Sequence, residues 1–367
     1  MCGIAGYVGD RESADVLVDA LSKLEYRGYD SAGIAVFDHG NIKVKKCKGR
    51  LANLVEKMDE EGKPQGHVGI GHTRWATHGE PSDINSHPHG NKRVTIVHNG
   101  IIENYKKLKD FLIGEGYSFA SETDTEVAAK LLDYYYDGDP MKTIAKVLSE
   151  IKGSYALGIM FRDFPDEIFA VRKDSPLIVG VGEHENFIAS DVPAIIHYTR
   201  DYYLLDQNEI AVIKKDSVKI YDVHGNEIHK ELNTADWDVD AAEKGGYAHF
   251  MLKEIHEQPD SVKRTIMPRI TDDMPDFSAE GFNPDKLKSY KNIYIVACGT
   301  AMHAGMVGKY IIEKIARVSV TVDIASEFRY RDPLINEGDL MIVISQSGET
   351  ADTKAALELA KQAGADT

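Results

Sequence analysis

Cysteine is scarce in this chain of 367 residues, where only Cys2, Cys47 and Cys298 occur, far from one another. Three isolated cysteines form neither a disulfide framework nor a paired zinc motif, so they predict a reducing compartment. Long apolar runs are lacking too, because none approaches the ~20 residues that a membrane-spanning helix needs. The opening residues also lack the basic and apolar regions of a signal peptide. We therefore expect a cytoplasmic protein with no membrane partner.

Basic residues are outnumbered, with 43 Lys and Arg against 59 Asp and Glu and a net charge of -16. Nucleic-acid backbones select basic surfaces, so this balance argues against a nucleic-acid partner. It leaves room for a small anionic ligand, since helix N-termini and hydroxyl groups bind phosphate without net positive charge. A hydrophobic content of 43% and a charged content of 28% are typical of a globular protein. The length predicts two domains or one large one.

The first nine residues read Met1-Cys2-Gly3-Ile4-Ala5-Gly6-Tyr7-Val8-Gly9. Removal of Met1 would leave Cys2 with both a thiol and a free α-amine, which titrates near ~8 and can act as a base at neutral pH. This is the N-terminal-nucleophile arrangement. The apolar residues that follow predict a buried strand that holds Cys2 in place. The structural alternative is that Cys2 is only a small hydrophobe.

The residues up to about 240 predict a strand-rich domain with early helices rather than a strictly alternating βαβ pattern. Apolar residues at helical spacing predict a helix between Ser13 and Leu24. Further strands are expected at 34–37, 42–44, 153–160, 168–172 and 209–213, the first two joined by a hairpin at 38–41. Composition then turns acidic and glycine-rich. We expect a first domain at 2–238, a linker at 239–247 and a second domain at 248–367.

The segment 67–104 is the richest in polar groups and holds six histidines. Their spacings match no compact zinc pattern and include no His-Glu-x-x-His helix, so we predict no metal site. Asn99-Gly100 stands between two apolar runs, a pattern typical of a tight hairpin turn. Such a turn would also aim an amide and a backbone N–H at one point, as an oxyanion hole requires.

Two charged residues near this segment have both a functional and a structural interpretation. The planar fork of Arg74 could hold a carboxylate beside Trp75, or Arg74 could be a surface residue that covers a buried Trp75. Asp124 precedes an apolar helical pattern, so its structural alternative is simple capping of that helix. Taken singly, each residue is explained by structure alone.

Taken together, five motifs resemble the glutaminase domain of the class II (N-terminal-nucleophile) glutamine amidotransferases, over roughly the first 240 residues. The motifs are Met1-Cys2-Gly3-Ile4, Arg27-Gly28-Tyr29-Asp30-Ser31, Thr73-Arg74-Trp75-Ala76-Thr77-His78-Gly79, His98-Asn99-Gly100 and Ser121-Glu122-Thr123-Asp124-Thr125. The resemblance implies an α+β fold for this half, the αββα sandwich of N-terminal-nucleophile hydrolases.

The resemblance also implies a role for each matching residue. Cys2 would attack the side-chain amide of L-glutamine, its α-amine would be the base, and Asn99 and Gly100 would form the oxyanion hole. The remaining assignments are Arg74 for the substrate α-carboxylate, Asp124 for the α-ammonium, Thr77, His78 and Gly28 for the pocket wall, and Trp75 as a gate for ammonia.

The second half predicts an α/β domain with strands and helices in alternation. A helix from 250 should end near Pro259, followed by a polar loop to about Ser289. Strands are expected at 292–297, 318–324 and 340–344, with helices reaching 316 and about 363. This order predicts a doubly wound parallel sheet, whose ligands bind at the carboxyl ends of the strands.

Two polar loops should lie at that edge of the sheet. Cys298-Gly299-Thr300 does not fit the dinucleotide fingerprint, so we do not expect NAD. The stretch 345–350 offers hydroxyl groups and a helix N-terminus that suit a phosphate, or Ser345 or Ser347 simply caps the helix. This half resembles a sugar isomerase (SIS) domain. The resemblance implies a sugar-phosphate site formed by Cys298, Gly299, Thr300, Ser345, Gln346, Ser347 and Thr350.

A class II glutaminase followed by a SIS domain resembles the glutamine–fructose-6-phosphate aminotransferase family, over the whole chain. The family implies hydrolysis of glutamine at Cys2 and transfer of the ammonia to fructose 6-phosphate, giving glucosamine 6-phosphate for amino-sugar synthesis without a cofactor. Its members continue with more of the second sheet and a second SIS subdomain. We therefore expect an incomplete SIS domain, a chain that keeps mainly the glutaminase chemistry, and a homodimer only where the isomerase part is complete.

Three alternatives remain from the sequence. The first is a non-catalytic sugar-phosphate sensor built on the SIS domain, which would bind its ligand independently of Cys2. The second is another glutaminase-linked synthase, for asparagine or nucleotide precursors, although the motifs that such enzymes carry are not found. The third is a self-processing N-terminal-nucleophile hydrolase, which would need a propeptide before Cys2.

Overall fold

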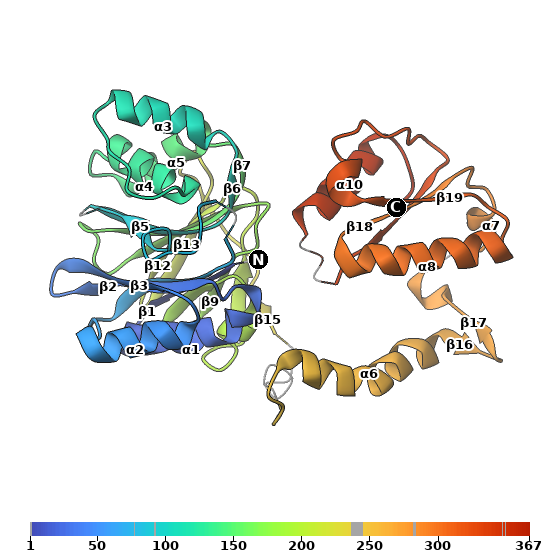
Figure 1. Ribbon diagram of the computed structural model, residues 1–367, viewed down its shortest axis with the longest axis horizontal. Helices are drawn as coiled ribbons and strands as arrows, with labels where there is room; N and C mark the ends of the chain where they lie inside the picture. The colour runs from blue at the N-terminus through green and yellow to red at the C-terminus, as the bar shows by residue number, and fades with distance from the viewer. Residues whose placement is uncertain are drawn as a thin grey trace. The chain divides into compact units, whose positions relative to one another are not determined.

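The computed structural model describes residues 2–76, 78–91, 93–235, 245–281, 284–346, 348 and 350–367. The chain divides into two compact units, Met1–Glu243 and Lys244–Thr367, each described here by itself (Figure 1). Residues 239–244 of the predicted linker lie outside the described residues. Within the described part, no helix has the length and apolar character needed to cross a bilayer.

Unit 1 is built on two antiparallel sheets. In sheet order, the eight-stranded sheet contains β15 (Asn233–Thr234), β11 (Asp201–Leu204), β9 (Ile178–Val181), β10 (Asn186–Ala189), β1 (Gly3–Val8), β4 (Val68–Arg74), β2 (Ser31–Asp38) and β3 (Asn41–Lys48). The seven-stranded sheet contains β14 (Glu227–Ile228), β13 (Ser217–Tyr221), β12 (Ile210–Lys214), β8 (Ile168–Lys173), β7 (Gly153–Phe161), β6 (Val94–Ile102) and β5 (His89–Gly90). The strands predicted from the sequence are therefore confirmed.

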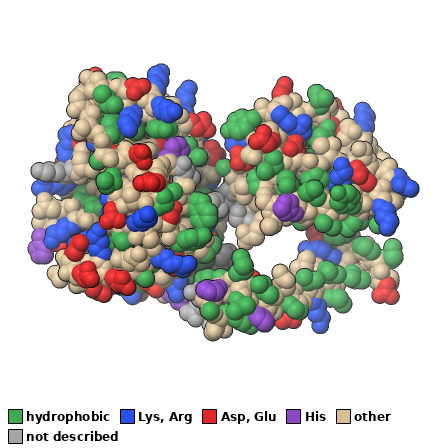
Figure 2. Space-filling view, viewed as in Figure 1, with side chains coloured by type: hydrophobic (Ala, Val, Ile, Leu, Met, Phe, Trp, Pro, Cys, Tyr) green, Lys and Arg blue, Asp and Glu red, His purple; other side chains and the backbone are tan. Residues whose placement is uncertain are grey.

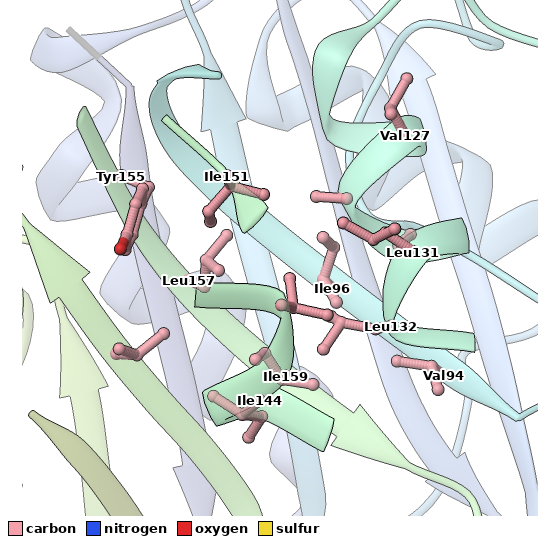
Figure 3. Close-up of a cluster of buried hydrophobic side chains, with 14 of the residues drawn as sticks. Val94, Ile96, Val127, Leu131, Leu132, Ile144, Ile151, Tyr155, Leu157 and Ile159 are labelled. Carbon is pink, nitrogen blue, oxygen red and sulfur yellow. The ribbon is translucent and has the colours of Figure 1, made fainter. Parts of the chain in front are cut away.

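Helices cover the outer faces of both sheets. Helices α1 (Ser13–Leu24) and α2 (Leu51–Glu61) pack on the eight-stranded sheet. Helices α3 (Tyr105–Gly114), α4 (Asp124–Tyr135) and α5 (Pro140–Glu150) pack on the seven-stranded sheet. Figure 3 shows Leu131 and Leu132 of α4 with Ile144 of α5 against Ile96 and Ile159 of that sheet. A third apolar cluster lies between the two sheets, so the predicted αββα sandwich is confirmed.

Strand β1 occupies the middle of its sheet, hydrogen bonded to β10 on one side and to β4 on the other. Ala5 lies opposite Ala189 of β10 and Gly71 of β4. All six residues of β1 are buried. The chain therefore enters the central core almost at once, and Cys2 is held at the very start of a strand with partners on both sides.

The predicted hairpin turn at Asn99-Gly100 is wrong. Both residues belong to β6 and pair across to Ala156 and Tyr155 of β7. Gly100 has φ +119°, and a Cβ there would lie 2.1 Å from the Ser154 carbonyl oxygen, so only glycine fits this point of the strand. The Asn-Gly turn signal is overridden because β6 continues to pair with β7 as far as Gly153.

Unit 2 contains a three-stranded parallel sheet in the order β19 (Val320–Ile324), β18 (Ile293–Ala297) and β20 (Leu340–Ile344). Helix α8 (Gly299–Ile315) packs on one face through Ile312, while α9 (Ala325–Phe328) and α10 (Ala351–Gln362) pack on the other. The predicted doubly wound parallel sheet is confirmed.

Helix α6 (Phe250–Ile266) does not end at Pro259 as the sequence predicted, but runs through it. A proline removes one backbone donor from the helix. The carbonyl that loses its hydrogen-bond donor is that of Ile255. Because Ile255 is 53% exposed, water can take the place of the missing donor. Figure 2 shows hydrophobic side chains along the surface of this helix. After it come β16 (Ile270–Thr271), β17 (Met274–Pro275) and α7 (Pro284–Leu287), where the sequence predicted a loop.

Candidate active site

The thiol of Cys2 lies against the backbone of Trp75. Its sulfur accepts a hydrogen bond from Trp75 N at 3.1 Å and donates one to Trp75 O at 3.4 Å. Burial raises the pKa of the Cys2 thiol, and the hydrogen bond from the Trp75 N–H opposes that rise. The site therefore places a backbone donor where it stabilises the thiolate, the nucleophilic form of the side chain.

Two side-chain donors hold the Cys2 backbone. Asn99 Nδ2 donates to Cys2 O at 3.1 Å, and Arg27 Nε donates to the same oxygen at 3.2 Å. The Arg27 guanidinium is almost fully buried and pairs with Asp191 through Nη1 at 3.1 Å. Two donors therefore fix the carbonyl of the predicted nucleophile, and one of them, Asn99, is the predicted oxyanion residue.

Gly28 packs against the segment that contacts the thiol. A Cβ on Gly28 would lie 2.6 Å from Arg74 C, 2.7 Å from Arg74 O and 2.9 Å from Trp75 N. The neighbouring Asp30 accepts from Ala76 N and donates its own N–H to Arg74 O. The turn after α1 and the end of β4 therefore hold the backbone of residues 74–76 beside Cys2.

The sequence offered a surface Arg74 over a buried Trp75, and the structure has the opposite. Arg74 is 3% exposed and Trp75 is 48% exposed, with the Trp75 ring edge-on to Tyr29 at 5.3 Å. The Arg74 guanidinium donates to the carbonyl oxygens of His78, Gly79 and Glu80. The His78 ring lies edge-on to Tyr105 at 5.2 Å. The predicted pocket residue Thr77 lies outside the described residues.

Asp124 is buried as the first residue of α4, but it does not cap the helix. The cap is Thr123, whose side chain accepts from Glu126 N. Asp124 Oδ2 instead accepts from Ile102 N at 2.8 Å, two residues beyond Gly100 in β6. Capping by Asp124 is therefore wrong, and the carboxylate is tied to the strand that carries the predicted oxyanion hole.

Buried histidines lie beside this strand. His72 Nε2 is 3.0 Å from both Asn99 Oδ1 and His98 O, and the His87 ring lies 4.1 Å from the His72 ring. Burial lowers the pKa of His72 to about 3 and that of His89 to about 3. Among the described residues, no cluster of three or more His, Cys, Asp or Glu side chains is placed to hold a metal ion.

The predicted sugar-phosphate residues of unit 2 gather at one edge of its sheet. Ala297 of β18 and Ile344 of β20 are register partners, so the loops that begin at Cys298 and Ser345 lie side by side. Cys298 Sγ accepts from Thr353 Oγ1 of α10 at 3.8 Å. Gly299 and Thr300 begin α8, Gln346 is exposed, and Ser347 lies outside the described residues.

The sequence also offered Ser345 or Ser347 as the cap of the last helix. The N-cap residue of α10 is Thr350, without a side-chain hydrogen bond, so capping by Ser345 is wrong. Ser345 Oγ instead accepts from Gly348 N at 3.0 Å inside the loop. The turn that this bond closes shapes the loop and leaves the helix start to Thr350.

Sequence reasoning missed four residues that contact the predicted site: Arg27, Asp30, His72 and Ser190. Arg27 and Asp30 stand within a motif that carried the resemblance, where only Gly28 received a role. Ser190 contacts Asn99 across a separation of 91 residues, and no local pattern signals it. The contact between Ser190 and Asn99 depends on the pairing of β1 with β10, and no pattern in the sequence predicts that pairing.

Two domain families match the chain. The glutamine amidotransferase domain family matches residues 72–197, and the SIS domain family matches residues 286–367. A glutamine–fructose-6-phosphate aminotransferase (isomerizing) of Caldanaerobacter subterraneus subsp. tengcongensis is 60% identical over 368 residues, 99% of this chain and 60% of that protein. The protein of the same name from Clostridium tetani is 58% identical over 369 residues, 100% of this chain and 60% of its own length. The chain therefore spans about 60% of the length of these curated relatives.

Among solved structures, a glutamine phosphoribosylpyrophosphate amidotransferase from B. subtilis is similar with a TM-score of 0.55 and 20% identity. The match covers 88% of this chain and 65% of the other. An allosteric regulatory enzyme of purine biosynthesis matches with a TM-score of 0.55 and 18% identity, over 99% of this chain and 79% of the other. At these identities the likeness bears on the fold alone.

Proposed function

The chain is a relative of the glutamine–fructose-6-phosphate aminotransferases, and from that premise we propose that unit 1 hydrolyses L-glutamine at Cys2. The observation that carries the proposal is the convergence on Cys2 of Trp75 N, Asn99 Nδ2 and Arg27 Nε. Trp75 N fixes the Cys2 thiol, and the other two donors fix the Cys2 carbonyl. One of these two is the Asn99 amide, which is also the group proposed for the oxyanion hole.

The reaction follows from this arrangement once Met1 is removed. The Cys2 sulfur attacks the side-chain amide carbon of glutamine, and the α-amine takes the thiol proton. The amide oxygen then carries negative charge, which Asn99 Nδ2 and Gly100 N are proposed to stabilise. The α-ammonium returns the proton to the leaving nitrogen, the C–N bond breaks, and ammonia departs. Water adds to the remaining γ-glutamyl thioester, releasing glutamate and restoring the thiol.

Two buried charges suit the ends of the substrate. A zwitterionic amino acid needs one fixed cation and one fixed anion, and an arginine can hold a carboxylate through two parallel bonds. Arg74 and Asp124 are both 3% exposed. We assign Arg74 to the α-carboxylate and Asp124 to the α-ammonium, with Gly28 and His78 in the pocket wall. Trp75 lies next to the thiol and is about half exposed, and we assign it as the gate through which ammonia leaves.

For unit 2 we propose a sugar-phosphate site at the carboxyl ends of β18 and β20. The loops that start at Cys298 and Ser345 meet there, and the second ends at the N-terminus of α10, where backbone N–H groups favour an anion. The name of the relatives indicates fructose 6-phosphate as the acceptor of the amino group. The proposed overall reaction is therefore the transfer of glutamine nitrogen to that sugar phosphate, giving glucosamine 6-phosphate.

The test is glutamate release from L-glutamine by the purified chain, with the intact mass read on the same sample. We expect turnover by the species that lacks Met1 and none by the Cys2→Ala variant. Binding of fructose 6-phosphate, measured by calorimetry, should survive Cys2→Ala, because the two sites lie in separate units. A Met1-free chain that releases no glutamate would overturn the assignment of Cys2 as nucleophile.

A further inference from the structure

The side-chain amide of Asn99 is held from both of its ends. Its Oδ1 lies 3.0 Å from His72 Nε2. Its Nδ2 donates to Cys2 O at 3.1 Å and to Ser190 Oγ at 2.9 Å. All of these groups except Cys2 are at most 6% exposed, so water does not compete for the amide. The proposed oxyanion residue is therefore fixed by neighbours that the proposed reaction does not consume.

The chemistry of these neighbours sets the direction of the amide. A backbone carbonyl only accepts, so the Asn99 atom facing Cys2 O has to be the nitrogen. His72 Nε2 also faces His98 O at 3.0 Å, another pure acceptor, so this ring nitrogen carries the hydrogen. The Asn99 atom that faces His72 is consequently the oxygen. Both ends therefore require the same orientation. In a flipped amide, the oxygen would face the Cys2 carbonyl oxygen and the NH2 group would face the His72 N–H.

The state of the His72 ring supports the assignment. His72 Nδ1 is buried without a hydrogen-bond partner in the described structure, as expected of the bare nitrogen of a neutral ring. Burial lowers the pKa of His72 to about 3, so the ring is neutral at neutral pH. One tautomer, with its hydrogen on Nε2, therefore persists.

Ser190 holds the other end of the amide and ties it to the nucleophile strand. Its Oγ accepts from Asn99 Nδ2 at 2.9 Å and from Ile4 N at 2.8 Å, and its own N–H donates to Ile4 O at 3.0 Å. A hydroxyl oxygen has two lone pairs, and both are used here. Because Ser190 takes one hydrogen of Nδ2, the other hydrogen is directed to Cys2.

We infer that His72 and Ser190 are positioning residues that orient the Asn99 amide so that one N–H faces the adduct formed on Cys2. The inference rests on the proposed function, in which Asn99 stabilises that adduct. Without the His72 donor, the amide can turn about its last bond and present its oxygen to the developing negative charge. Without Ser190, the nitrogen loses the partner that directs its other hydrogen to Cys2.

The test compares two ligands of the full, Met1-free chain. L-glutamate γ-semialdehyde forms a tetrahedral adduct with a thiol and so uses the oxyanion donor, whereas L-glutamate forms no adduct. We expect His72→Phe and Ser190→Ala to weaken inhibition by the aldehyde by about ten- to a hundredfold and to lower kcat to a similar extent. Inhibition by glutamate and the KM for glutamine should stay near wild-type values. His72→Gln, which keeps an N–H near the Nε2 position, should recover most of the loss.

Matched controls separate positioning from damage to the core. His89→Phe removes an imidazole that is equally buried but contacts Asn85 and Thr123. Ser13→Ala removes a fully buried hydroxyl that has no partner in the described structure. Both should leave the ratio of aldehyde to glutamate affinity unchanged. An equal loss of both affinities in His72→Phe and Ser190→Ala, or no loss in either, overturns the inference. A wild-type chain without turnover would instead count against the proposed function itself.

Discussion

Four buried histidines, His72, His87, His89 and His98, give unit 1 a built-in sensitivity to acid. Burial lowers the pKa of each, to about 3 for His72 and His89. In the unfolded chain the same rings bind protons near pH ~6.5. Below that value the unfolded state therefore holds more protons, and the free energy of unfolding falls as the pH drops toward 3.

We predict that unit 1 is most stable above pH ~6.5 and that His72 and His89 each lower its free energy of unfolding by about 1.4 kcal/mol per pH unit below that value, with His87 and His98 acting in the same direction. Urea unfolding of the chain at several pH values between 5 and 8 measures the slope. His184 is the control, because its partner Asp216 raises the pKa of that exposed ring, so His184→Gln should not flatten the curve. A stability that is flat across this range would contradict the prediction.

The position of Gly28 gives a second prediction at the scale of single residues. In Gly28→Ala the new methyl group would meet the backbone of Arg74 and Trp75 at 2.6–2.9 Å, and backbone cannot rotate away as a side chain can. Because that backbone holds the Cys2 thiol, we expect kcat for glutamine hydrolysis to fall at least about tenfold.

The control for this variant is Gly114→Ala at the end of α3, where a Cβ meets nothing within 4 Å. It should leave kcat unchanged and raise the free energy of unfolding by about 0.5–1 kcal/mol at most. Steady-state kinetics with a thermal melt of each variant decide the matter. Equal activities in the two variants would show that the contact at Gly28 is not needed.

At the scale of whole elements, periodicity predicted the strands and helices well, because it reports burial directly. It failed where a short motif that is typical of a turn or a helix end lies in a paired strand or an exposed helix. Asn99-Gly100 has the composition of a turn but lies within β6, because pairing with β7 extends beyond it. Pro259 should end a helix, yet α6 continues to Ile266 on an exposed surface. Asp124 looked like a cap, but the cap is its neighbour Thr123.

The proline inside α6 makes that helix a target for stabilisation. Pro259→Ala restores a backbone donor and removes the steric conflict with the preceding turn, so we expect α6 to open less readily by about 1–3 kcal/mol. Hydrogen exchange of the amides around residues 255–263 should slow accordingly. Gln258→Ala, next to it on the same helix, should change exchange little. Unchanged protection in Pro259→Ala would mean that the helix is held by contacts rather than by its own hydrogen bonds.

At the scale of the whole molecule, every residue assigned to glutamine chemistry lies in unit 1, and every residue assigned to the sugar phosphate lies in unit 2. A fragment ending at Glu243 should therefore fold and hydrolyse glutamine with a kcat close to that of the full chain. The comparison is made on Met1-free samples of equal concentration. A fragment that folds but has lost its activity would place part of the glutamine site in unit 2.

Periodicity predicted the two folds, and the family resemblance of short motifs placed Cys2, Asn99 and Arg74 in one site, where the structure brings the Asn99 amide to the Cys2 carbonyl. The sequence did not predict Arg27, His72 or Ser190, whose contacts depend on which strands become neighbours. Ser190 reaches Ile4 across 186 residues, and Arg27 reaches Asp191 across 164. Pairing of this range is decided by the core as a whole, so it becomes visible only when the sheets are assembled.

The central place of β1 also has a consequence for the order of events during synthesis. Cys2 comes earlier in the chain than the groups that hold it, since β1 pairs with β10 and the Asn99 amide donates to Ser190. A nascent chain that stops short of residue 190 therefore carries the nucleophile without its setting. If the proposed function holds, we expect ammonia release to begin only after most of unit 1 has been translated.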